Sequence, residues 1–354
     1  PLLIGGATTS KAHTSIKIAP HYHGAVCHVG DASLVVEVCN DLISPERKEA
    51  FKEKLKIDQE AIRVRHAANV KDSVFLSLRD AREAKFKTDW ATAQIDIPSR
   101  LGVWEQPNLT LEEVAKYIDW SPFFWTWEIK ALYPKVLTHK VWGEQATELF
   151  RDAQNILDDI IKNKRFDLRA ITALWPAQSV DDDVLVYDPD RPGHVLETLY
   201  FLRQQREREE KKPAFCLADY IAPKSSGRMD YIGGFAVTSG EEVDGTTENR
   251  TIEQLIKEDY RGLRPAPGYP ACPDHTEKAT LWRLMNVEER VGIKLTESYA
   301  MHPGSSVSGY YFSHPEAEYF RVGMINREQM ENYAKRKGMT IQETERWMQP
   351  NKGY

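Results

Sequence analysis

The first 45 residues alternate between short apolar runs and segments with helical periodicity. Residues 2–4 form an apolar run that ends at glycines, and residues 10–19 follow with the pattern of a helix that begins at a Ser10 cap. Residues 24–29 predict a second strand, and residues 31–43 a second helix with Asp31 as its N-cap. This alternation predicts a parallel sheet with helices on its faces. Because two strands do not form such a sheet alone, we expect the rest of this domain upstream of Pro1.

Residues 46–105 predict a linker between two domains. Residues 45–66 have a charge-rich helical pattern, whereas residues 67–105 look irregular, with a middle rich in lysine, aspartate and arginine. A charged run of this kind is more often a solvated face than a binding site.

Residues 106–354 mix strand and helix patterns without strict alternation. We predict helices at residues 146–166, 194–212 and 340–348, the last with a capping box of Thr340 and Glu343. Strands are predicted at residues 170–178, 183–189, 230–240 and within 294–313. The mixture favours an α+β domain. In the first helix the expected apolar stripe comprises Leu149, Phe150, Ala153, Ile156, Leu157, Ile160 and Ile161.

The composition narrows the function classes. Hydrophobic residues make up 41% of the 354 residues, charged residues 28%, and the formal charge is −6. A net negative charge argues against general nucleic-acid binding, and no apolar run approaches the roughly 20 residues that span a bilayer. The four cysteines lack C-x-x-C spacing, which is typical of reduced thiols. We therefore expect a cytoplasmic protein with no nucleic-acid and no membrane partner.

Two histidine- or glycine-rich motifs near the start have competing interpretations. The segment HYHGAVCH, residues 21–28, could hold a metal, but a polar loop that leads into a strand is the more common case. The glycine turn of residues 4–10 could bring backbone N–H groups to a phosphate. It is not G-x-G-x-x-G, so a tight turn between strand and helix is the simpler interpretation.

Three further segments could bind a ligand. Asp119 lies among aromatic residues in YIDWSPFFWTWEI, where it could cap a helix or meet a ligand ammonium. The proline-rich segment of residues 261–278 offers Arg264, whose planar guanidinium suits a carboxylate. A structural connector with a surface arginine is the commoner meaning of such a loop. The aromatic residues of GYYFSHPEAEYF could be core, or could stack on an adenine.

Long motifs of the second domain resemble a known family. The segments YIDWSPFFWTW, LWPAQSVDDDVLVY, CLADYIAPKSSGRMDYIGGFAV, RPAPGYPACPDHTEKATLW and LTESYAMHPGSSVSGYYFSHPEAEYF are similar to the C-terminal activation domain of cobalamin-dependent methionine synthase. The start, PLLIGGATTSKAHTSIKIAP, is similar to the end of the cobalamin-binding domain that precedes it. The resemblance implies an α+β activation domain over residues 106–354. It also implies the C-terminal part of a Rossmann-like α/β cobalamin-binding domain over residues 1–45.

The resemblance implies a function and a set of binding residues. The family binds S-adenosylmethionine (AdoMet) and supports the reductive remethylation of cob(II)alamin to methylcobalamin, with electrons from a flavodoxin-like donor. Asp119 would meet the amino group of AdoMet, Arg264 its carboxylate, and the backbone of residues 266–269 its adenosine. The implied AdoMet set is Asp119, Glu258, Arg264, Ala266, Gly268, Tyr269, Tyr319 and Phe320; the implied cobalamin set is Gly5, Gly6 and Ala32.

The sequence departs from the family pattern in two ways. A long helical segment that the family has after residue 245 or so is missing, and the cobalt-ligating histidine motif and the folate and homocysteine modules are absent. The resemblance implies that zinc belongs to the absent homocysteine module. We therefore expect a methyltransferase fragment that does not make methionine alone and whose partners include the upstream modules.

Two other function classes are compatible with parts of the sequence. One is a non-catalytic docking module that cages cobalamin and recruits the flavodoxin-like donor. The other, a nucleotide-dependent oxidoreductase, lacks the full glycine fingerprint and the acidic partner expected downstream.

Overall fold

The structure is a computed structural model of the chain. It describes all residues except 6–9, 31–34, 72–73, 108, 208–211 and 240–261, and the side chains of residues 67–71 also stay outside the description.

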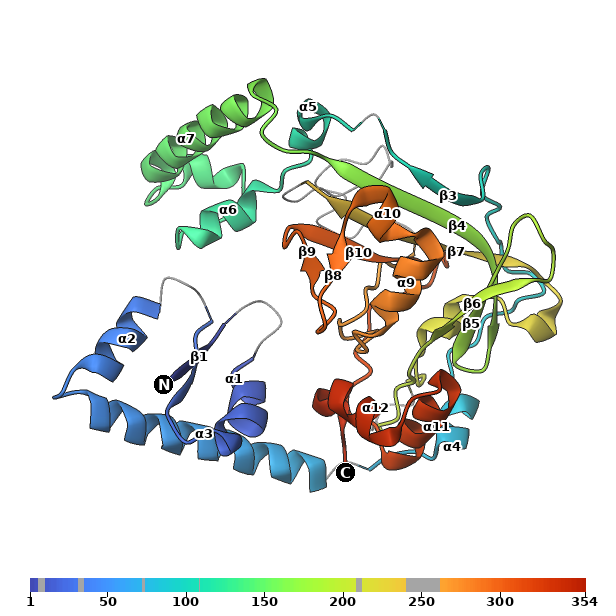
Figure 1. Cartoon of the computed structure of the whole chain (residues 1–354), viewed down its shortest axis with the longest axis horizontal. Coiled ribbons are helices and arrows are strands. Elements are labelled where there is room, and N and C mark those ends of the chain that lie inside the picture. The colour runs from blue at the N-terminus through green and yellow to red at the C-terminus, as the bar shows by residue number, and fades with distance from the viewer. Residues whose placement is uncertain (6–9, 31–34, 72–73, 108, 208–211, 240–261) are drawn as a thin grey trace.

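An antiparallel sheet of six strands organises the larger part of the chain (Figure 1). The order along the main path is β10-β7-β4-β5-β6, and β3 pairs with β4 beyond the stretch that β5 covers. The longest strand, β4, carries the central pairing, with nine residue pairs to β7. The strands are β3 (Gly102–Glu105), β4 (Arg169–Val180), β5 (Asp183–Tyr187), β6 (Val195–Tyr200), β7 (Asp230–Thr238) and β10 (Ser306–Tyr311).

One face of this sheet is covered by α9 (Glu277–Met285) and α10 (Val287–Val291). Trp175 of β4, Leu281 and Met285 belong to one cluster of fully or nearly fully buried side chains between sheet and helices. Burial of such side chains stabilises a fold by about 1.5–3 kcal/mol each.

The predicted strands at 170–178, 183–189, 230–240 and within 294–313 are confirmed by β4, β5, β7 and β10.

A helical group lies beside one end of the sheet and has its own small core. It comprises α5 (Leu111–Ala115), α6 (Trp120–Thr126) and α7 (Gly143–Lys162), with the 3-10 turn η4 (Lys135–Thr138) between the last two. Phe124, Val136 and Ala146 are completely buried in this core. The predicted helix at 146–166 is confirmed, although Ile156 of the expected stripe is 62% exposed.

The chain ends in a helical pair, α11 (Arg327–Lys337) and α12 (Ile341–Trp347). Met330, Tyr333 and Met348 pack with Leu202, which follows β6. The predicted cap at Thr340 is confirmed, because its hydroxyl accepts a hydrogen bond from the Glu343 amide at 3.2 Å. The remaining short elements are η5 (Leu217–Tyr220), η6 (Lys224–Ser226), β8 (Lys294–Leu295), β9 (Met301–His302) and η7 (Gln349–Asn351).

The N-terminal region contains two parallel strands, β1 (Leu2–Ile4) and β2 (Val26–His28), as the sequence predicts. Ser10 caps the segment after β1, since its hydroxyl accepts from the His13 amide at 3.0 Å. That segment is not one α-helix but α1 (Lys11–His13), a π-helical turn η1 (Thr14–Ile18) and a 3-10 turn η2 (Ala19–His21). Helix α2 (Val35–Ile43) is confirmed, whereas its predicted cap Asp31 lies outside the described residues.

The prediction of an irregular segment at residues 67–105 was wrong in three places. Helix α3 (Lys48–Lys71) continues past residue 66, α4 (Leu78–Glu83) begins at a Ser77 cap, and β3 joins the sheet. In addition, Phe86 stacks on Phe215 with ring centroids 5.7 Å apart. Strand β3 and the Phe86 stack depend on partners far away in the sequence, which no local pattern indicates. The domain boundaries at 45 and 105 remain predictions.

The predicted helix at residues 194–212 was also wrong over its described residues; residues 208–211 lie outside them. Residues 195–200 form β6, which pairs antiparallel with β5. Residues 201–205, which follow, are all buried. The spacing of Val195, Leu196, Leu199 and Leu202 fits a helical stripe, but pairing with β5 decides the conformation.

Candidate functional site

The proline-rich segment runs antiparallel to β10 and its continuation. Leu263 exchanges two backbone hydrogen bonds with Phe312, at 2.8 and 2.9 Å, and the Pro265 carbonyl accepts from the Tyr310 amide at 2.9 Å. Pro265 and Pro267 have fixed φ and no N–H donor, so this segment cannot extend the sheet further. We call residues 262–272 the arginine loop.

The tip of the arginine loop is closed by its own backbone. The Gly268 amide donates to the Cys272 carbonyl at 2.8 Å, and the Cys272 amide donates to the Tyr269 carbonyl at 2.9 Å. Gly268 has a φ of +95°, which strongly favours glycine. At the far end, the Pro270 carbonyl accepts from the Val322 amide at 2.9 Å. The loop is therefore fixed at both sides, which limits the ordering cost of binding a ligand.

Arg264 and Tyr319 lie together although 55 residues separate them. The Arg264 amide donates to the Tyr319 hydroxyl at 3.0 Å. The Arg264 guanidinium carbon lies 5.8 Å from the ring centroid of Tyr311, within the range of a cation–π contact. Tyr319 is 44% exposed and Arg264 is half-buried. A guanidinium held at such a surface can pair with a carboxylate from solution.

Phe320 points into the core instead. Its ring stacks on Phe215 with centroids 5.7 Å apart and an angle of 22° between the planes. The two neighbours thus differ: Tyr319 faces outward at the loop, and Phe320 supports the core behind it.

Asp119 is the N-cap of α6. Its carboxylate accepts a hydrogen bond from the Ser121 amide at 2.9 Å, and the residue is half-buried. The neighbouring Trp120 makes edge-on contacts with Phe123 and Phe150, at 5.6 and 5.0 Å between centroids. Of the two meanings that the sequence left open for Asp119, the structure shows the cap. A capping carboxylate keeps oxygen lone pairs for a further donor, so this role does not exclude the other.

Comparison with known proteins decides the family. The family model described as "Vitamin B12 dependent methionine synthase, activation domain" matches residues 110–249 and 243–338. The chain belongs to this family. The two matched segments overlap at residues 243–249, the place where the sequence suggests a missing helical segment.

A solved structure of this activation-domain family is similar over most of the chain. It is the crystal structure of the MetH reactivation domain bound to AdoHcy, with 42% sequence identity and a TM-score of 0.74. The match covers 79% of this chain and 99% of that one. The mixed helix and strand architecture is therefore that of the reactivation domain.

Three of the predicted binding residues lie outside the described residues. These are Gly6, Ala32 and Glu258. Gly5 is described and directly follows β1. A Cβ atom at this position would lie 3.2 Å from the Val29 carbonyl oxygen.

Sequence reasoning missed a pair of residues beside the loop. The Lys278 ammonium nitrogen lies 2.9 Å from Nδ1 of His275, and Lys278 is only 7% exposed. The histidine–lysine spacing in DHTEK was visible in the sequence, but burial of the lysine was not.

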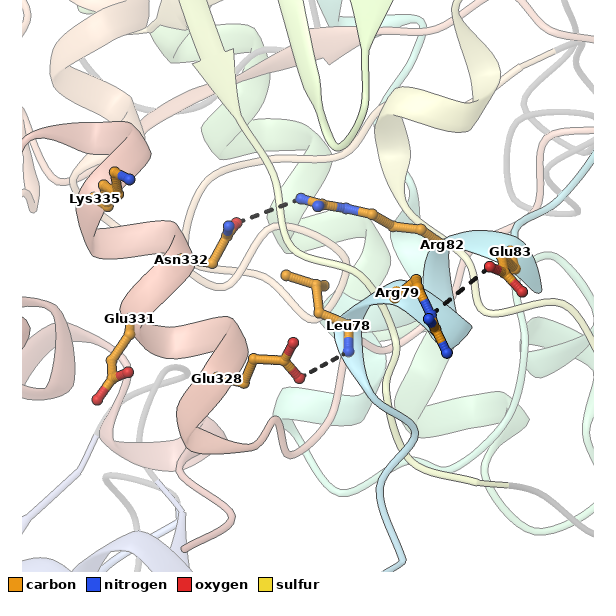
Figure 2. A pocket seen from close by; sticks show the side chains of 8 residues that line it. All are labelled: Leu78, Arg79, Arg82, Glu83, Glu328, Glu331, Asn332 and Lys335. Atoms are coloured by element: carbon orange, nitrogen blue, oxygen red, sulfur yellow. Dashed lines mark hydrogen bonds and ion pairs between the residues drawn. The ribbon is translucent and has the colours of Figure 1, made fainter.

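A large hollow lies elsewhere, between α4 and α11 (Figure 2). It has a volume of about 610 Å³ and is open to solvent. Glu328 accepts from the Leu78 amide at 2.9 Å and Asn332 accepts from Arg82 at 3.4 Å, so these groups attach α4 to α11. None of the predicted site residues lines it. Its lining residues are Leu78, Arg79, Arg82, Glu83, Glu328, Glu331, Asn332 and Lys335.

The described residues show no metal cluster and no disulfide. Within them, no group of three or more His, Cys, Asp or Glu side chains could hold a metal ion, and this includes residues 21–28. All four cysteines are free thiols. Among the helices of the described parts, none combines the length and the apolarity that crossing a membrane requires.

Proposed function

We propose that this chain is the AdoMet-binding reactivation module of a cobalamin-dependent methionine synthase. The observation that carries the proposal is the 42% identity, over 79% of the chain, to a reactivation domain bound to AdoHcy. In the full enzyme, the module would work with the upstream cobalamin, folate and homocysteine modules and a flavodoxin-like electron donor in the cytoplasm. It would support the return of an inactive cobalamin to the methylated form at the expense of AdoMet.

The arginine loop provides the binding chemistry for AdoMet. Arg264 would pair with the ligand carboxylate, because a guanidinium and a carboxylate form two parallel hydrogen bonds. Asp119 would receive the ligand ammonium at the lone pairs that its own helix leaves available. The backbone of residues 266–269 would hold the adenosine, and the outward ring of Tyr319 would lie beside it.

In this arrangement the methyl group is the part of the ligand that the protein does not bind. Methyl transfer from a sulfonium moves no proton, so the chain needs no general acid or base for it. Positioning is the main contribution of the protein, and fixed geometry of two reacting groups is worth up to about 7–11 kcal/mol. Glu258 and Phe320 complete the proposed ligand set, the latter through the packing that supports Tyr319.

The N-terminal residues are proposed to line the nucleotide tail of cobalamin. The proposal is supported at Gly5, where a Cβ atom would lie 3.2 Å from the Val29 carbonyl oxygen, so a side chain at this position would crowd the Val29 backbone. Gly6 and Ala32 belong to the same proposed cobalamin set. When bound, cobalamin supplies the cobalt centre that accepts a methyl group.

Removing the Arg264 guanidinium tests the proposed carboxylate contact. Arg264→Ala is expected to weaken AdoMet binding by about 1–3 kcal/mol, or roughly 5- to 150-fold, because a charged hydrogen bond is lost. Isothermal titration calorimetry measures the change. Arg290→Ala, which removes a half-exposed arginine paired with Glu105 on the surface, is the control and should bind as the wild type does. Equal affinities of the Arg264→Ala variant and the wild type would contradict the assignment.

Two substitutions of Asp119 separate its two roles. Asp119→Ser keeps a side-chain oxygen for the Ser121 amide and removes the charge, whereas Asp119→Ala removes both. We expect the serine variant to keep the thermal stability of the wild type and to bind AdoMet more weakly, whereas the alanine variant also loses about 0.5–2 kcal/mol of stability. If the serine variant binds AdoMet as tightly as the wild type, Asp119 is only a cap.

A further inference from the structure

Lys278 is a buried lysine in the first turn of α9. Only 7% of it is exposed, and burial lowers its pKa to about 8. At neutral pH it therefore still carries a proton in most molecules. An ammonium group is only a donor, so the 2.9 Å contact between its nitrogen and Nδ1 of His275 requires that Nδ1 accepts. The neutral imidazole then carries its proton on Nε2.

The ring of His275 lies directly against the tip of the arginine loop. A Cβ atom added to Gly268 would be 2.3 Å from Cε1 of His275 and 2.5 Å from Nδ1. The space that a side chain at position 268 would occupy is therefore filled by the imidazole. Because the imidazole packs against Gly268, a rotation of the ring changes the contact that holds Gly268 in place.

The backbone beside His275 is anchored independently. Asp274 accepts hydrogen bonds from the Thr276 amide at 2.8 Å and the Tyr333 hydroxyl at 2.7 Å. Lys337 of α11 pairs with both Asp274 and Glu277. The polypeptide on either side of His275 is thus held, and the torsion of its side chain is the freedom that remains.

We propose that Lys278 is a positioning residue for the arginine loop, which it controls by fixing the His275 imidazole against Gly268. The inference rests on the proposed function, since it concerns the backbone assigned to the adenosine of AdoMet. Lys278 does not touch the ligand; it acts through the ring of His275.

The charges around the pair determine how it responds to pH. The Cys272 thiol is neutral because burial raises its pKa well above the ordinary value. Asp274 is a carboxylate, since Lys337 outweighs burial and lowers its pKa. The pKa of His275 is lowered first by burial and then by the Lys278 charge, with Asp274 acting in the opposite direction. Protonation of His275 at acidic pH would place a second donor against the ammonium and break the contact.

The first test measures the tautomer and the titration of His275 and needs no ligand. In a chain with ¹⁵N-labelled histidine, the His275 resonances of the wild type should show the Nε2–H tautomer, with a titration midpoint below the ordinary 6.5. Lys278→Met should raise this midpoint, because the nearby positive charge is gone. The exposed Lys224→Met variant is the control and should leave it unchanged. A proton on Nδ1 in the wild type, or a midpoint that Lys278→Met does not move, overturns the proposal.

The second test measures AdoMet affinity in a double-mutant cycle. Lys278→Met is expected to weaken binding about tenfold at pH 7.5, and His275→Ala by a similar factor. If Lys278 acts through the ring, adding Lys278→Met to His275→Ala should change the affinity less than about twofold. Full additivity, or wild-type affinity in Lys278→Met, overturns the positioning role. A wild type that binds no AdoMet overturns the proposed function and this role together, and the histidine titration then still reports on the pair.

Discussion

Replacing Arg203 by methionine is expected to lower the free energy of unfolding by about 3–5 kcal/mol, the usual cost of removing one partner of a buried ion pair. Arg203 is 1% exposed and lies just after β6. Its guanidinium donates to Asp182 at 2.8 Å and to both carboxylate oxygens of Asp219 at 2.7 Å. A fourth hydrogen bond, at 2.7 Å, goes to the Ala214 carbonyl. Methionine fills a similar volume but satisfies none of these acceptors.

The pH dependence of the Arg203 variant identifies the mechanism. Burial alone would raise the pKa of Asp182, but Arg203 and Arg82 outweigh it and lower the pKa below 3.8. In the wild type this contribution is present above pH 3.8 and is lost as the pH falls through the lowered pKa. In the variant the buried carboxylates lack the Arg203 charge, so they favour the protonated form. Acid protonates them and removes the cost of a buried unpaired charge. The difference in the free energy of unfolding between the variant and the wild type should therefore shrink at low pH.

Urea denaturation at pH 7 and pH 4.5 measures both effects. Arg327→Met, which breaks an exposed pair with Glu331, is the matched control and should cost no more than about 0.5 kcal/mol. If Arg203→Met costs as little as the control, the buried network is not a source of stability.

Replacing Gly262 by alanine should disconnect the arginine loop from β10. A Cβ atom there would lie 1.8 Å from the Phe312 carbonyl oxygen, a backbone atom whose group accepts from the Leu263 amide. The two segments must separate, and overpacking of this kind costs about 1–3 kcal/mol or more. Because Arg264 lies two residues further on, we expect AdoMet affinity to fall by more than about tenfold, as measured by calorimetry.

Gly102→Ala is a close control for this variant. Gly102 and Gly262 share a φ of +92°, but no described heavy atom lies within 4 Å of a Cβ at position 102. The control therefore reports only the backbone strain, about 1–2 kcal/mol, and should bind AdoMet as the wild type does. Equal loss of affinity in the two variants would show that the contact with Phe312 is not what positions the loop.

The strands of the sheet were largely predictable from sequence, because alternating or continuous apolar runs such as those of β4 and β7 report burial directly. Helix α7 was predictable for the same reason. Residues 194–212 were not, since the spacing of Val195, Leu199 and Leu202 fits a helix and a strand alike, and only pairing with β5 decides between them. Strand β3 depends on β4 in the same way.

The candidate site was predictable only as separate pieces. The sequence singled out Arg264, Asp119 and the tyrosines around 319, and the structure joins Arg264 to Tyr319 through a hydrogen bond from the Arg264 amide to the Tyr319 hydroxyl. The cap formed by Asp119 was one of two meanings that local sequence allowed. Burial of Lys278 and its contact with His275 depend on how α9 packs under the loop, which no local pattern encodes.

Calorimetric titration of AdoMet into the purified chain decides whether the chain binds this ligand. We expect saturable binding with one site per chain, competition by AdoHcy, and weaker binding in the Arg264→Ala variant. A folded chain that releases no heat of binding with AdoMet or AdoHcy would contradict the proposed function.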